Sequence, residues 1–159
     1  MMSMAFELLR LIHILSSTIL FGTGLGTAFH MWMTHLRGDV GAIAATARNV
    51  VLADWLFTAT SGIVQPVTGI ALVIVGGYDP ASSWLVATYC LYVLAGACWL
   101  NVVGLQIRVS RIAGQCARED APLPLAYAHA MQAWFWLGWP AFIALIGVFW
   151  LMVSKPDLW

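Results

Sequence analysis

Four long stretches of this chain contain no Asp, Glu, Lys or Arg: residues 11–36, 55–78, 80–107 and 121–154. Each is longer than the roughly 20 residues with which an α-helix crosses the hydrocarbon core of a bilayer. Charged residues make up only 9% of the chain, against about a quarter in soluble domains. We therefore predict an all-α polytopic membrane protein, a four-transmembrane-helix bundle that forms one domain over residues 1–159.

The spans are expected at about 6–34, 50–77, 84–108 and 130–154, with the lipid bilayer as the main partner and no nucleic-acid partner. The first apolar run continues to about His35 and follows a segment without net charge, so we interpret it as a mature helix rather than a signal peptide. The segment 111–127 contains Gly114, Pro122 and Pro124 and is expected to be the least ordered part of the chain.

The basic residues predict the orientation in the membrane. Only two of them, Arg10 and Lys155, fall on the side that the two termini would share. The other five fall in or near the loops between spans 1 and 2 and between spans 3 and 4: Arg37, Arg48, Arg108, Arg111 and Arg118. The positive-inside rule then places these loops in the cytoplasm and both termini on the non-cytoplasmic side of the cell (inner) membrane.

The first span carries a histidine, His13, within an apolar helix. At 100° per residue, its face also holds Ser17, Leu20, Gly24 and Thr27. Gly22 and Gly26 lie on the opposite face with the Gly-x-x-x-Gly spacing that lets a second helix approach closely, either within the bundle or in a homo-oligomer.

A notch of small residues beside an intramembrane imidazole suits haem b, whose iron accepts a neutral histidine nitrogen. We expect His13 to bind the iron in a pocket lined by Ser17, Gly24 and Gln65, with a redox role, either as a haem-dependent oxidoreductase or beside a membrane redox partner. No second imidazole is expected at the same depth. Alternatively, His13 only bonds a neighbouring helix, or the chain is a cofactor-free subunit or small transporter in which His13, Gln65 and Asp54 line a polar path.

A second candidate site is the sequence "HMWMTH" at residues 30–35. Its imidazole and thioether groups suit copper(I), with His30, Met33 and His35 as the candidate ligands. His129 at the start of span 4 is expected at the same end of the bundle. His30 and His129 could instead hold a second haem.

Asp54 begins the second charge-poor helix at about the depth of two arginines. An unpaired carboxylate in a membrane is costly, so we expect a structural ion pair of Asp54 with Arg108 or Arg48. A proton or anion path to the cytoplasm is the alternative.

Several segments resemble a bacterial family of small four-span predicted integral membrane proteins of unknown function. They are "LIHILSSTILFGTGLGTAF", "GDVGAIAATARNVVLADWLFT", "QPVTGIAL", "LAGACWL", "LQIR" and "GWPAFIAL". The resemblance covers nearly the whole chain and implies a four-helix membrane protein.

More remotely, the early histidine, the basic first loop and the four helices are similar to HemJ-type protoporphyrinogen oxidases, which bind haem b, and to CopD-type membrane domains. His13 would match the span-1 histidine of the HemJ-type proteins. Those enzymes also carry a His and a Lys early in span 3, where this chain reads "WLVATYC". The resemblance therefore implies haem binding more than protoporphyrinogen oxidation.

Overall fold

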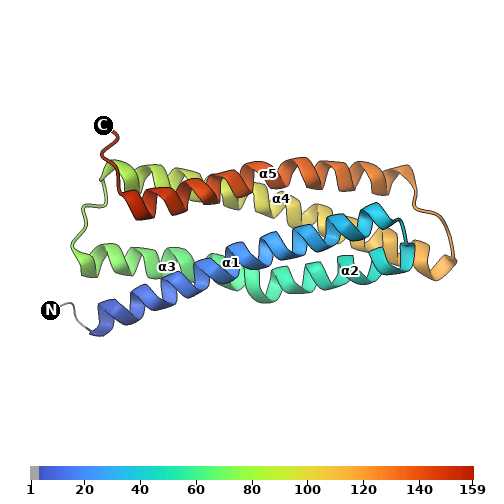
Figure 1. Cartoon of the computed structure of the whole chain (residues 1–159), viewed down its shortest axis with the longest axis horizontal. Coiled ribbons are helices and arrows are strands. Elements are labelled where there is room, and N and C mark those ends of the chain that lie inside the picture. Colours follow the sequence, from blue (N-terminus) through green and yellow to red (C-terminus); the bar gives the residue numbers. More distant parts are fainter. Residues whose placement is uncertain (1–3) are drawn as a thin grey trace.

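The structure, a computed structural model, describes residues 4–159 as a bundle of long helices (Figure 1). The helices are α1 (Met4–Arg37), α2 (Val40–Ala53), α3 (Ala59–Gly76), α4 (Ser83–Glu119) and α5 (Leu125–Ser154), and one turn of π-helix, η1 (Asp54–Thr58), joins α2 to α3. Counting Val40–Gly76 as one, four helical segments of the described chain are long and apolar enough to cross a membrane. The all-α four-span architecture predicted from the charge-free stretches is thus confirmed.

The two chain ends lie at the same end of the bundle, and the α1–α2 turn and the α4–α5 loop lie at the other (Figure 1). The α1–α2 turn is only Gly38 and Asp39. Gly38 adopts a φ of +75°, which glycine tolerates without strain, and the Asp39 carboxylate caps α2 by accepting from the Ala42 N–H at 2.7 Å. This tight turn takes the place of the first loop, which the predicted spans put at about 35–49.

The helices extend further than the predicted spans. α2 starts at Val40, and α4 continues to Glu119 through most of the segment that we expected to be poorly ordered. The residues of 111–119 are mostly good helix formers, and a single glycine costs a helix only about 1 kcal/mol. The connection to α5 is reduced to 120–124, where Pro122 and Pro124 end helical structure.

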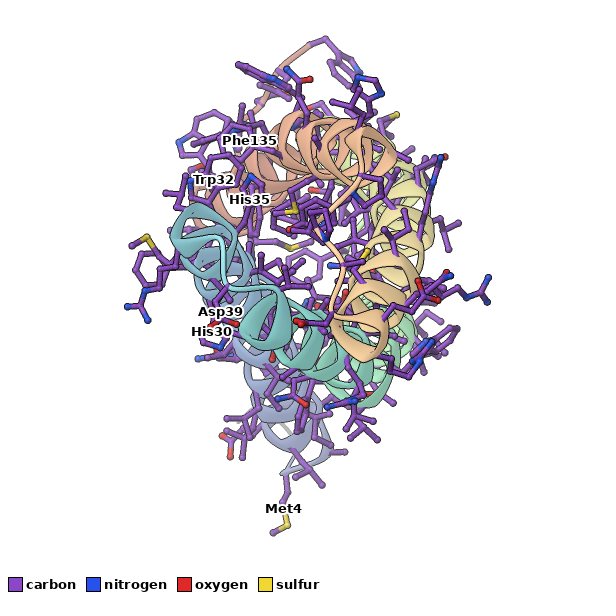
Figure 2. All side chains as sticks on the ribbon, turned by 90° about the vertical axis from the view of Figure 1, so that its right-hand side faces the viewer. Met4, His30, Trp32, His35, Asp39 and Phe135 are labelled. Carbon is purple, nitrogen blue, oxygen red and sulfur yellow. The ribbon has the colours of Figure 1, made fainter. Side chains whose placement is uncertain are left out.

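The core has two different halves. Near the α1–α2 turn it is apolar, and its members come from α1, α2, α4 and α5: Met31, Ile43, Ala47, Val50, Val102, Val109, Ala113, Tyr127, Ala130, Met131 and Trp134. At this end Trp32 stacks on Phe135 with ring centroids 4.3 Å apart, and Figure 2 shows both beside His35. Toward the chain ends, the interior of the α1–α3 contact is polar, and it contains the candidate site.

Candidate functional site

Every buried side chain between residues 54 and 76 is polar. These residues are Asp54, Thr58, Ser61, Gln65 and Thr68, which we call the polar seam. Their spacing of four, three, four and three residues keeps them on one face of the helix. At 1.5 Å per residue the polar seam covers about 21 Å, a large part of the roughly 30 Å hydrocarbon core. The side of this helix that faces the protein is therefore more polar than the side that faces lipid.

One end of the polar seam binds the His13 side chain of α1. A hydrogen bond of 2.8 Å joins His13 Nδ1 to the Thr68 hydroxyl. Because that hydroxyl donates to the Val64 carbonyl at 2.7 Å, we infer that Nδ1 carries the hydrogen and that the lone pair lies on Nε2. No hydrogen bond is formed by Nε2 within residues 4–159. The imidazole thus has a fixed orientation and a free basic nitrogen.

Gln65 fixes the backbone around this histidine. Its Nε2 donates to the His13 carbonyl at 2.7 Å and to the Ser16 hydroxyl at 2.8 Å. Ser16 in turn donates to the same carbonyl at 3.1 Å. On the α3 side the imidazole lies against Gly69, where an added Cβ would come within 3.3 Å of His13 Cε1. The polar network and the glycine together dock α1 onto α3.

The other end of the polar seam is Asp54, which is only 4% exposed. Its Oδ1 accepts from the Thr58 hydroxyl at 2.8 Å, and the side chain of Gln106 from α4 lies beside it. Within the described chain, two buried oxygens here have no hydrogen-bond partner: Asp54 Oδ2 and Gln106 Oε1. Asp54 also begins the π-helical turn η1, a distortion that is frequent at functional sites.

The pocket predicted beside His13 is only partly formed. Gln65 contacts His13 through the backbone carbonyl of the histidine, and its side chain makes no hydrogen bond to the imidazole. Ser17 donates its hydroxyl to the Ile14 carbonyl at 2.7 Å. The notch expected at Gly24 is occupied by the Phe142 side chain of α5. A Cβ added at Gly24 would lie 3.6 Å from Cζ of Phe142. A flat ring could use this notch only if Phe142 moved.

Comparison with known families agrees with the fold. The sequence profile of a family described as "Predicted integral membrane protein (DUF2269)" matches residues 7–156. The chain belongs to this family. No curated protein and no solved structure matches the chain. The family is of unknown function.

In this member of the family, the copper candidates on α1 do not all share one face of the helix. His30, Met33 and His129 are exposed, whereas half-buried His35 bonds the Tyr127 hydroxyl through Nδ1 at 3.0 Å. His30 and His35 are five residues apart and so point about 140° away from each other around α1. Residues 4–159 contain no group of three His, Cys, Asp or Glu that could hold a metal ion. Copper or a second haem at these residues stays a prediction.

The structure also does not form the expected ion pair at Asp54. Arg48 and Arg108 are both exposed, and neither makes an ion pair with Asp54 in the described chain. Arg48 is six residues before Asp54, about 120° away from it around the helix, so the two side chains leave the helix on different faces. Asp54 is bound instead by Thr58 one turn further along.

The two glycines opposite His13 are not used for packing within the chain. Gly22 and Gly26 are exposed, and an added Cβ at either would meet nothing within 4 Å. Close approach of a second helix at this face is therefore left to another molecule. The homo-oligomer stays a prediction.

Four residues of the site were not identified from the sequence: Ser16, Thr58, Ser61 and Thr68. The sequence does contain a pattern that could have identified three of them. Thr58, Ser61 and Thr68 follow, together with Asp54 and Gln65, the heptad spacing of one helix face. Ser and Thr are common in membrane helices, where they bond their own backbone, so each one alone indicates little.

Proposed function

We propose that this protein is a small membrane transporter that carries protons along the polar seam. The observation that carries the proposal is the row of buried polar side chains on one helix face from Asp54 to Thr68, which ends on His13. Carboxyl and imidazole groups inside membrane helices typically form proton relays. Here one such group stands at each end of the row, and hydroxyl and amide groups lie between them.

The two end groups have the chemistry that proton transfer needs. Asp54 as a carboxylate can take a proton on Oδ2, the oxygen without a partner, and can then donate to the neighbouring Gln106 side chain. Thr58 holds the other oxygen in both states. His13 can take a proton on Nε2 while Nδ1 stays bonded to Thr68. Each step moves one proton and requires no oxidant or reductant.

The test is proton flux in proteoliposomes that contain a pH-sensitive dye, driven by a potassium gradient with valinomycin. We expect flux above that of protein-free vesicles, and a loss of about tenfold or more in Asp54→Asn, since Asn cannot bind and release a proton. Thr60→Val is the matched control, because Thr60 lies on the same helix, is exposed and bonds only backbone carbonyls. Flux equal to that of empty vesicles, or unchanged in Asp54→Asn, would contradict the proposal.

Haem b bound through His13 is the second candidate, with a redox role. It is supported by the bonding of His13, because a ligating histidine typically donates one ring N–H to a fixed partner and offers the other nitrogen to the metal. Haem would supply one-electron chemistry at iron, Thr68 would orient the imidazole, and Phe142 would have to leave the Gly24 notch. Absorption spectra of the oxidised and dithionite-reduced protein test this candidate. A Soret band that is lost in His13→Ala supports it, and a colourless protein from haem-supplied cells rejects it.

A further inference from the structure

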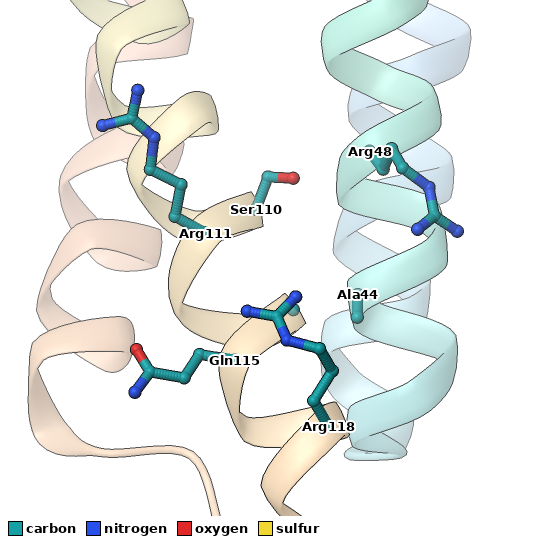
Figure 3. A pocket seen from close by; sticks show the side chains of 7 residues that line it. Ala44, Arg48, Ser110, Arg111, Gln115 and Arg118 are labelled. Carbon is teal, nitrogen blue, oxygen red and sulfur yellow. The ribbon is translucent and has the colours of Figure 1, made fainter.

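A hollow of about 380 Å³ opens between α2 and α4 at the end of the bundle with the α1–α2 turn. Its polar lining comes from Arg48 on α2 and from Ser110, Arg111, Gln115 and Arg118 on α4. Figure 3 shows the three arginine side chains on the two helices that border the hollow, with the guanidinium groups of Arg48 and Arg111 pointing in opposite directions. The polar seam lies deeper in the bundle, so this is a separate site.

The positive charge around the hollow is not neutralised by the protein. None of the lining residues is acidic, and none of the three arginines makes an ion pair in the part of the chain that the structure describes. The carboxylate of Glu119 is bonded to the Gln115 amide at 3.0 Å rather than to an arginine. The positive charges of the three arginines repel one another, so an anion bound in the hollow would lower the energy of this arrangement.

Small residues open the space between the two helices. Ala44 lines the hollow on α2, and Gly114 lines it on α4. The Arg118 side chain lies over Gly114, since an added Cβ there would be 3.7 Å from Arg118 Nη1. A larger residue at either position would fill the hollow. The sequence thus combines long cationic side chains with the room for a ligand between them.

We propose that this hollow binds a phosphate group, either that of an anionic lipid headgroup or a free phosphate ion. Arginine is suited to phosphate because its planar fork of N–H donors matches two phosphate oxygens. Ser110 and Gln115 supply further polar groups in the lining. Basic pockets between membrane helices at the cytoplasmic side typically bind phosphate headgroups.

The neighbouring surface of α2 favours the lipid as the source. Leu52 and Trp55 follow Arg48 by four and seven residues, on the same helix face and toward the membrane. They are 56% and 58% exposed. A lipid with its phosphate at Arg48 could therefore lay its acyl chain along these two side chains.

Arginines at this end of the bundle would also set the orientation of the protein in the membrane. That role depends only on how many basic residues lie near the helix ends. Phosphate binding requires in addition that Arg48, Arg111 and Arg118, which line one hollow, turn their guanidinium groups into it. Arg37 is the matched control, since it is exposed at the same end but does not line the hollow. The two roles can therefore be separated by substitution.

The experiment is native mass spectrometry and thermal denaturation of the purified chain, first in phosphatidylcholine, then with phosphatidylglycerol or inorganic phosphate added. We expect phosphatidylglycerol to bind and to raise the midpoint of unfolding, with affinity at least about tenfold lower in Arg48→Gln/Arg111→Gln/Arg118→Gln and unchanged in Arg37→Gln. The single variant Arg118→Gln is compared in the same way if the triple variant fails to fold.

Binding of phosphatidylglycerol alone identifies the lipid as the source, and binding of inorganic phosphate with the same arginine dependence identifies the phosphate group as sufficient. Binding of neither, or equal binding by Arg118→Gln and Arg37→Gln, overturns the proposal. The measurement involves no transport, so it is independent of the proton pathway proposed above.

Discussion

Replacing Asp54 by Asn should make the protein more stable, and it should also abolish the proton transfer proposed above. Asn has nearly the same shape as Asp but carries no charge, and its amide group takes the place of Oδ2, which has no hydrogen-bond partner within residues 4–159. If the neighbouring Gln106 amide turns over, the new N–H can donate to its side-chain oxygen, which is also without a partner there. Thr58 can still donate to the remaining oxygen of residue 54.

The size of the effect follows from the burial of this carboxyl. A buried acceptor without a hydrogen bond destabilises a protein by about 1–3 kcal/mol, and the structure has Asp54 only 4% exposed. For a chain of this size, 1 kcal/mol shifts the midpoint of thermal unfolding by roughly 2–4 °C. We therefore expect Asp54→Asn to raise the midpoint by about 2–12 °C.

The assay is thermal unfolding in one detergent, followed by intrinsic tryptophan fluorescence, for the wild type, Asp54→Asn and Thr58→Val. Thr58→Val removes the donor to the carboxyl and should lower the midpoint. A double-mutant cycle should show that the two substitutions are coupled by about 0.5–3 kcal/mol. An Asp54→Asn protein that unfolds at a lower temperature than the wild type would contradict this prediction, since it would mean that the charge of Asp54 is stabilising.

Two further substitutions test the contacts of His13 and His35. Gly69→Ala should destabilise the chain by about 1–3 kcal/mol, because the added methyl group comes within 3.3 Å of His13 Cε1 and pushes the ring from its bond to Thr68. Tyr127→Phe should cost about 0.5–1.5 kcal/mol, because it removes the hydrogen bond to His35 from a residue that is only 2% exposed. Both are measured as shifts in the midpoint of unfolding.

Each substitution has a control in the same chain. Gly62→Ala places its methyl group 3.8 Å from the nearest side-chain atom, an ordinary contact, and should change little. Tyr89→Phe removes a hydroxyl from an exposed residue that makes no hydrogen bond within the described chain. If the controls destabilise as much as Gly69→Ala and Tyr127→Phe, the assigned contacts are not the cause.

The architecture was predictable because lipid leaves a chain few choices. Stretches of more than 20 residues without charge must form helices whose backbone groups bond within the helix. The helix ends were less predictable. Gly38 and Asp39 mark the α1–α2 turn clearly, yet polarity alone suggested a helix start near residue 50, although nothing between Val40 and Ala53 breaks a helix.

The site was predictable only in part. His13 and Gln65 are conspicuous because each is polar in an apolar sequence, and the structure brings them into contact. The partner of Asp54 was not predictable from charge alone, because Thr58 on the same helix competes with the arginines and is held in place by the helix itself. The filling of the Gly24 notch by Phe142 depends on how α1 and α5 cross, which no local pattern determines.

The short turn at Gly38 and Asp39 also has a consequence for mapping the topology of the chain. With two residues between α1 and α2, the two helices leave the turn side by side and in opposite directions. A reporter domain fused into this turn would have to force the two helices apart, and it would disturb the topology that it was meant to map.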